Sequence, residues 1–230
     1  MILRLRTLLV AGCFAGSALS AQSTRPPARC STTADFVVLE GHDTVTVSRV
    51  SLTDSTFEST VHAVSQSAFL RYTGRLTAAG EPRLLHMEVW PQIADSAGPP
   101  AQIADVVIQG ADVSARVAAP TRGIQLQHDR LPLGGVLYMT GAPLFLELFQ
   151  RHVHLAVGAT TTVPALWLFT GGAVDTVQVT RPAADSLTLR FSDVEYALAL
   201  APDRSILGAV SRPRPVTAGS PSRLLRRDCR

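Results

Sequence analysis

The chain has 230 residues, with 21 basic and 18 acidic side chains and a formal net charge of +3. Every basic residue is an arginine, which excludes chemistry that needs a lysine amine, such as a Schiff base or a Walker phosphate loop. This length suits a single domain with a sizeable core. The lack of a pattern of aromatic and basic residues predicts no nucleic-acid partner.

The first residues have the pattern of a secretory signal peptide. Arg4 and Arg6 give a positively charged start, an uncharged and mostly apolar stretch follows, and small residues end at Ala21. We therefore expect a signal peptide over residues 1–21 and an exported protein of the periplasm or the extracellular space. The residues before Cys13 also fit a bacterial lipobox, so a lipoprotein anchored at Cys13 is the alternative. Without that anchor, any membrane contact is expected to be peripheral.

Cys30 and Cys229 stay in the chain after cleavage and lie near its two ends. In an oxidising compartment such a pair predicts a disulfide. Closing a loop of this length would restrict the unfolded chain by about 5 kcal/mol in the chain-entropy account. Two unpaired thiols are the alternative.

Both ends of the mature chain have compositions typical of segments without regular structure. Residues 22–31 are rich in Ser, Thr, Pro and Ala, and are predicted to form a disordered leader. Residues 213–230 combine prolines and a glycine with several arginines, and are predicted to form a basic, flexible tail. Such a tail could also contact an anionic surface.

Short strand-like runs separated by turn residues fill residues 32–212. In the run 83–90, for example, Leu85 and Met87 share one face, and His86 and Glu88 share the other. Runs spaced by about 8 to 12 residues are typical of antiparallel sandwiches and barrels. The predicted fold class is all-β with one central helix, arranged as a curved antiparallel sheet, a half-barrel or a barrel.

One helix is expected near residues 142–152. Gly141 breaks the preceding run, and Pro143 suits the first helical position. The helix would carry an apolar stripe, which consists of Leu144, Phe145, Leu148 and Phe149.

Bulky apolar residues concentrate in this helix and in the strand-like run that follows it. They could line a pocket for a lipid or another apolar ligand, because such pockets are concave and mostly apolar. They could equally form a packed core. For the first interpretation, the predicted ligand-binding residues are Phe145, Leu148, Phe149, Trp167 and Phe169.

The segment from this helix to Val210 carries a family resemblance. It ends in a hairpin over residues 194–209, Val-Glu-Tyr-Ala-Leu-Ala-Leu-Ala-Pro-Asp-Arg-Ser-Ile-Leu-Gly-Ala. The segment resembles the end of uncharacterised bacterial envelope proteins with curved antiparallel sheets. In element order it is similar to the lipoprotein-localisation-factor (LolA/LolB-like) half-barrels. The resemblance implies a curved sheet around a helix, with an apolar concavity for acyl chains, and it transfers no functional residue.

Motifs for catalysis, for metal binding and for a cofactor are absent from the sequence. His152 and His154 straddle the expected helix end, where a metal-binding spacing is not defined. His86 and Glu88 could belong to an acid–base site or could simply face solvent. No catalytic residue, metal or cofactor is therefore predicted.

Three functions follow, in order of preference. The first is a non-enzymatic envelope protein that binds a lipid or another apolar small molecule. The alternative is a structural or protein-interaction module whose partner is another envelope protein, recognised by a sheet edge or by the arginine-rich tail. The third is a hydrolase with a dispersed site.

Overall fold

The computed structural model describes residues 32–169, 172–215 and 220–228. They form 15 strands, one α-helix and two short 3-10 helices. The helix is α1 (Pro143–His152), and the 3-10 helices are η1 (Val64–Gln66) and η2 (Ile93–Ala97). The strands are β1 (Thr33–Glu40), β2 (Asp43–Leu52), β3 (Thr56–Ala63), β4 (Ala68–Leu76), β5 (Pro82–Trp90), β6 (Gln102–Gln109), β7 (Asp112–Ala119), β8 (Gly123–Arg130), β9 (Val136–Tyr138), β10 (Thr160–Trp167), β11 (Val174–Ala183), β12 (Ser186–Arg190), β13 (Val194–Leu200), β14 (Ile206–Pro213) and β15 (Ser222–Arg226).

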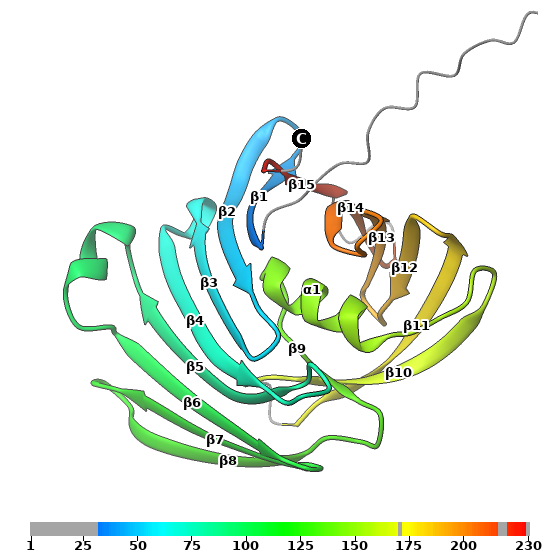
Figure 1. Cartoon of the computed structure of the whole chain (residues 1–230). Helices are drawn as coiled ribbons and strands as arrows, with labels where there is room; N and C mark the ends of the chain where they lie inside the picture. The colour runs from blue at the N-terminus through cyan, green and yellow to red at the C-terminus, as the bar shows by residue number, and fades with distance from the viewer. Residues whose placement is uncertain (1–31, 170–171, 216–219, 229–230) are drawn as a thin grey trace, which may run out of the picture.

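All the strands belong to one sheet, in the order β8-β7-β6-β5-β4-β3-β2-β1-β15-β14-β13-β12-β11-β10-β9. Neighbours pair antiparallel except β9 and β10, which pair in parallel. The sheet curls around α1, which lies on its concave side (Figure 1). The predicted fold class, a curved antiparallel sheet around one central helix, is confirmed.

The sheet consists of two meanders that meet in its middle. Strands β1 to β8 follow one another in one half, and β10 to β15 follow one another in the other. The halves join where β15 pairs with β1, so that Phe36 stands opposite Arg226. The prediction of a flexible tail from residue 213 is therefore wrong for residues 222–226. The prolines and arginines suggested a solvated end, but Leu224 is buried and β1 offers β15 an open edge.

The strands form because apolar residues alternate with polar ones, which gives each strand a buried and a solvated face. In β11, Val177 and Val179 are fully buried, and in β12 so are Leu187 and Leu189. The polar residues between them face outward. This alternation places the core on the concave side of the sheet, around α1.

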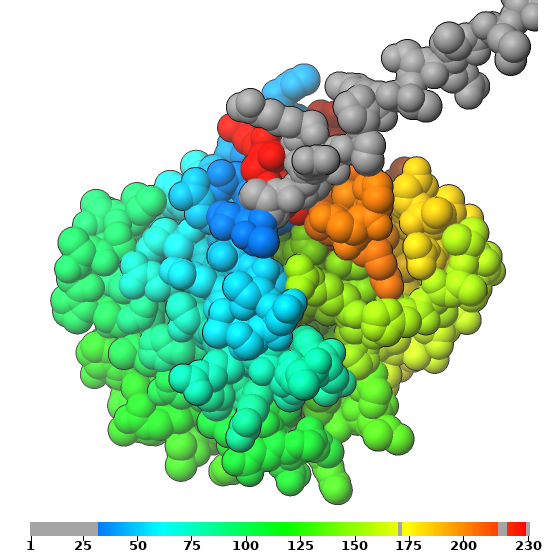
Figure 2. Space-filling view, viewed as in Figure 1, coloured from blue at the N-terminus to red at the C-terminus, as the bar shows by residue number. Residues whose placement is uncertain are grey.

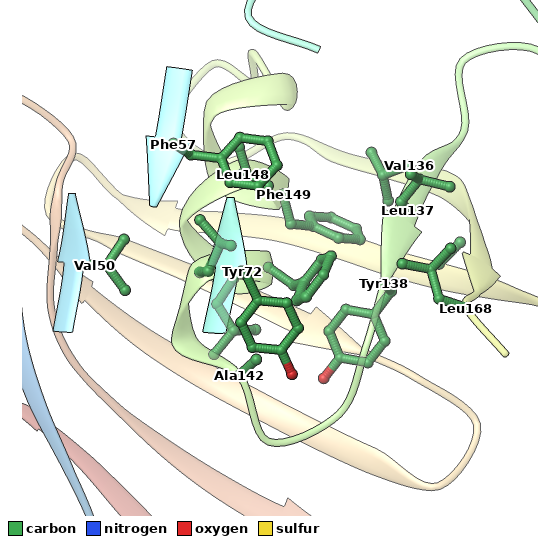
Figure 3. Close-up of a cluster of buried hydrophobic side chains, with 14 of the residues drawn as sticks. Val50, Phe57, Tyr72, Val136, Leu137, Tyr138, Ala142, Leu148, Phe149 and Leu168 are labelled. Carbon is green, nitrogen blue, oxygen red and sulfur yellow. The ribbon is translucent and has the colours of Figure 1, made fainter. Parts of the chain in front are cut away.

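Helix α1 joins the two halves of the core. Figure 3 shows Tyr72, from β4, and Tyr138, from β9, reaching toward the helix, while Phe149 points from the helix toward Val136 and Leu137. All eight residues from 143 to 150 are buried. In the space-filling view, side chains occupy the space between helix and sheet, and no wide opening is seen on this face (Figure 2).

Several sequence-based predictions fall outside the described residues. These are the signal peptide over 1–21, the lipobox at Cys13, the leader over 22–31, and the disulfide between Cys30 and Cys229. Within the described part of the chain, no helix is long and apolar enough to cross a membrane.

Candidate ligand-binding groove

The start of α1 leaves a groove against the concave side of the sheet. Gly141 precedes the helix with φ of +80°, a conformation that glycine adopts at no steric cost, and Pro143 opens the first turn. This N-terminal groove has a volume of about 300 Å³. It lies between the first turn of α1 and strands β1, β2, β13, β14 and β15. Its lining residues are Val38, Glu40, Val45, Thr46, Tyr138, Thr140, Gly141, Ala142, Pro143, Leu146, Asp193, Val194, Tyr196, Ala209, Ser211, Pro213, Ser220, Ser222 and Leu224.

The walls of the groove are mostly apolar, and hydroxyl groups supply much of its polarity. The Tyr138 hydroxyl donates a hydrogen bond to the Tyr196 hydroxyl at 3.0 Å. The hydroxyls of Ser211 and Ser222 lie 2.6 Å apart across β14 and β15. An apolar cavity with a few convergent polar groups is the usual form of a small-molecule site.

The surroundings of the two tyrosines disfavour a negative charge. Burial raises the pKa of Tyr138 well above its ordinary value, and the negative charge of Asp193 adds to this effect. Burial likewise raises the pKa of Tyr196. Both phenols are protonated at neutral pH, as tyrosines ordinarily are, and act as hydrogen-bond donors and acceptors.

An aromatic cluster supports this end of the groove from behind. The ring centroid of Phe191 lies 4.4 Å from that of Tyr138 and 5.9 Å from that of Tyr196. Trp167 and Phe149 pack against the same ring at 6.2 and 5.9 Å. These contacts hold the two tyrosine hydroxyls in place.

The five predicted ligand-binding residues are not gathered in one cavity. Phe145 and Phe149 are fully buried, and Phe145 packs edge-on against Tyr72 with the ring centroids 5.8 Å apart. Trp167 belongs to the aromatic cluster, and Phe169 lines a separate pocket beside Gln125 and Gln127 of β8. None of the five lines the N-terminal groove, and their role in ligand binding stays a prediction.

Leu148 and Phe149 do border a second, smaller cavity, which we name the C-terminal groove. It has a volume of about 210 Å³ and lies between the last turn of α1 and the segment that leads from β8 to β9. There His152 approaches Glu81, with Nδ1 3.6 Å from Oε1. Its lining residues are Gly80, Glu81, Pro82, Ile108, Gly110, Ala111, Leu131, Pro132, Leu133, Gly134, Gly135, Val136, Leu137, Leu148, Phe149 and His152.

The residues of the N-terminal groove do not stand out in the sequence, because many are small and they come from distant strands. Ala209 and Leu224, for example, alternate inward on β14 and β15, but the composition around β15 is typical of a flexible tail. The inward alternation of residues 194–200 and 206–210 is the signal that could have located one wall. Nothing in the sequence brings β1 beside β15.

A buried cluster of charges lies on another side of α1. Glu147 is 3% exposed, and its Oε1 accepts a hydrogen bond from the backbone N–H of Ile206 at 3.0 Å. The Arg226 guanidinium approaches the same oxygen at 3.9 Å and binds Asp228 through two shorter contacts. Burial raises the pKa of Glu147, against the opposing effects of Ile206, Arg151 and Arg226. This cluster ties the helix to β14 and β15.

The predicted outward pair, His86 and Glu88, lies on the convex side of the sheet. His86 Nδ1 is 2.7 Å from Asp105 Oδ1, and its Nε2 is 3.8 Å from Glu88 Oε1. Arg71 approaches Glu88 from the neighbouring strand at 3.4 Å. Both ring nitrogens of this half-buried histidine face carboxylates, whereas a nucleophile–base pair requires a hydroxyl or thiol next to one of them. Among the residues described, no three His, Cys, Asp or Glu side chains are grouped to hold a metal ion.

Comparison with known proteins gives two solved structures of partial similarity. Neither a protein-family model nor a curated protein sequence matches the chain. A DUF1089 family protein from Pseudomonas aeruginosa has 17% identity and a TM-score of 0.48, over 72% of this chain and 89% of that one. A β-barrel-like protein of the domain of unknown function DUF1849 from Brucella abortus has 9% identity and a TM-score of 0.44, over 88% of this chain and 96% of that one.

Proposed function

We propose that this chain is an exported, non-enzymatic protein of the cell envelope that holds a small apolar ligand in the N-terminal groove. The observation that carries this proposal is the groove itself, with apolar walls and two hydroxyl pairs between α1 and the sheet. Its volume lies at the lower end of the range for small-molecule sites, about 300 to 1,000 Å³. A ligand there would be a small molecule, or one end of a larger lipid.

Two features of the sequence support the location and the ligand class. The first 21 residues have the composition of an export signal. The resemblance to lipoprotein-localisation-factor half-barrels, in element order, agrees with a concave sheet that holds apolar chains. We propose export on the basis of this sequence pattern, and a relation to that family on the basis of the element order.

A titration with 1-octanol, a neutral apolar probe, tests the groove. We expect saturable heat of binding with the full chain in isothermal titration calorimetry. Ala209→Leu places a larger side chain in the groove and should weaken binding at least about tenfold. Ala197→Leu adds the same atoms on the exposed outer face of β13 and should leave binding unchanged.

Ala209 is a core residue, so Ala209→Leu could also destabilise the fold by overpacking. A second variant separates loss of binding from loss of folding. Val45→Phe enters the groove from a half-buried position on its rim. It should weaken binding while the far-ultraviolet circular dichroism stays that of the wild type. If 1-octanol bound equally to the wild type and to both groove variants, the proposed site would be wrong.

A protein-interaction module is the second candidate, and the edge strand β8 favours it. Ile124 and Leu126 on this strand are 60% and 70% exposed, and among the described strands β7 is its one partner. An open edge with apolar side chains is the surface that β-strand addition uses. A photo-crosslinker at position 126 should capture a discrete envelope protein in the exporting cell. No discrete adduct at 126, compared with position 60 on the outer face of β3, would contradict this candidate.

A further inference from the structure

The charges around the N-terminal groove are all of one sign. Its lining residues include two carboxylates, Glu40 at the end of β1 and Asp193 before β13, and no arginine or histidine. Both carboxylates are exposed, and neither forms an ion pair with another of the described residues. Positive and negative charges nearly balance in the whole chain, but all the charged residues that line this groove are acidic.

The negative charge of Asp193 acts on the interior of the groove as well as on its rim. It contributes to the raised pKa of both Tyr138 and Tyr196. The carboxylate therefore lies close enough to the hydroxyl pair to oppose a second negative charge there. An anionic headgroup placed beside these hydroxyls would meet the same repulsion.

Arg214 contacts Asp193 through the backbone, and its guanidinium binds elsewhere. The backbone N–H of Arg214 donates to the carbonyl of Asp193 at 2.6 Å. Its guanidinium donates to the carbonyl of Phe191 at 2.9 Å and is not part of the groove lining. The arginine thus supports the turn between β12 and β13, and the groove lining itself carries only acidic charges.

The volume of the groove limits the apolar part of the ligand. At about 300 Å³, it lies at the lower end of the range for small-molecule sites. This size suits a short alkyl chain or one ring with a substituent.

We infer that the ligand of the N-terminal groove is a small cationic amphiphile, a short apolar body that carries an ammonium group at the rim. This inference rests on the proposed function and specifies its ligand class. The apolar body lies against Leu146, Ala209 and Leu224, and the ammonium group lies near Asp193, while Glu40 adds negative charge elsewhere on the rim. Fatty acids and anionic lipid headgroups are disfavoured by the same charges.

Three probes that share an eight-carbon chain test the inference: 1-octylamine, 1-octanol and octanoate. At pH 7 and low salt the first is cationic, the second neutral and the third anionic. Titration calorimetry with the full chain should give affinities in that order, with 1-octylamine at least about tenfold tighter than octanoate, because opposite charges at a solvated rim attract moderately. Added salt should reduce the difference between the affinities for 1-octylamine and octanoate, because it screens the charges at the rim.

Charge-neutralising variants separate the rim from the groove. We expect Asp193→Asn to lower the affinity for 1-octylamine toward the affinity for 1-octanol. The double variant with Glu40→Gln should do the same. Neither variant should change the affinity for 1-octanol. Glu58→Gln, which removes an exposed carboxylate on the convex side of β3, should change neither affinity. If Asp193 had only a structural role, Asp193→Asn would lower the affinities for all three probes together.

The outcomes distinguish this inference from the proposed function. If 1-octanol binds and the three affinities are equal, or octanoate binds tightest, the cationic ligand class is wrong and the groove proposal stands. If none of the probes binds, the proposed function itself fails, and this inference fails with it.

Discussion

The guanidinium carbon of Arg226 lies 5.9 Å from the ring centroid of Phe36, across the pairing of β15 with β1. The arginine side chain is 2% exposed and also binds Asp228 through two contacts of 2.9 and 3.0 Å. This contact lies where the N-terminal and C-terminal halves of the sheet meet. The last strand of the chain therefore closes the fold.

Replacement of Arg226 should destabilise the protein strongly. Arg226→Ala removes one partner of a buried ion pair and leaves Asp228 and Glu147 without its charge, which costs about 3 to 5 kcal/mol of unfolding free energy. Urea unfolding followed by circular dichroism measures the loss. Arg223→Ala, an exposed arginine on the same strand, is the control and should change the unfolding free energy by less than about 0.5 kcal/mol. Equal effects of the two variants would show that β15 is not part of the stable core.

Glu147 should make stability depend on pH. Burial raises its folded-state pKa above the ordinary value of 4.5, so folding favours the protonated form. Its contribution is fully present below the unfolded pKa and is lost as the pH rises through the folded pKa. Glu147→Gln keeps an acceptor for the N–H of Ile206 and removes this titration.

Urea midpoints measured from pH 4 upward check the Glu147 prediction. The wild type should lose stability with rising pH relative to Glu147→Gln, and the variant should be the more stable protein at neutral pH. A variant that is less stable than the wild type at every pH would mean that the charged carboxylate is the favoured form, held by Arg226 and Arg151.

Arg204 should stabilise the end of α1 from a distant hairpin. It has φ of +68° in the turn between β13 and β14, and its guanidinium donates to the carbonyls of Val153 at 2.6 Å and Gln150 at 3.2 Å. A cation at a helix C-terminus also favours the helix dipole. Arg204→Ala should cost about 2 to 3 kcal/mol, because hydrogen bonds to charged groups are among the stronger ones.

Thermal unfolding of the variant tests the role of Arg204, with Arg190→Ala as the control. Arg190 pairs with Glu195 at 3.7 Å on the exposed face, and such pairs contribute about 1 kcal/mol or less. If Arg204→Ala and Arg190→Ala had the same midpoint of thermal unfolding, the contacts of Arg204 with the helix end would have no net effect on stability.

The disulfide between Cys30 and Cys229 stays a prediction, and the neighbouring residues favour it. The backbone N–H of Asp35 donates to Asp228 at 3.1 Å, and that of Arg227 donates to the carbonyl of Asp35 at 2.8 Å. The described ends of the chain thus lie side by side. Alkylation of the exported, denatured protein without reductant should modify neither cysteine, and modification of both would contradict the pairing.

The fold class could be predicted because strand periodicity is a local property. Residues such as Leu187 and Leu189 alternate with polar neighbours, and the Pro143 start and apolar stripe of α1 are equally local. The position of β15 could not be predicted in this way. Its burial depends on β1, which lies nearly 200 residues earlier in the chain, and its arginines are typical of a solvated end.

The site was harder to predict for a related reason. Bulky residues such as Phe145 and Phe149 attract attention in a sequence, but in this fold they fill the core. The groove forms where small residues such as Ala142 and Ala209 leave space between the helix and the sheet. A cavity is a property of packing between distant segments, and side-chain size along the chain does not reveal it.

Native mass spectrometry of the mature full chain, purified from the exporting compartment without detergent, tests the central claim most directly. We expect a bound molecule that organic extraction releases, or the uptake of one 1-octanol by the empty protein, with both effects lost in Ala209→Leu and kept in Ala197→Leu. A wild-type protein that stays at its bare mass before and after incubation with 1-octanol would contradict the claim that the groove between α1 and the sheet holds an apolar ligand.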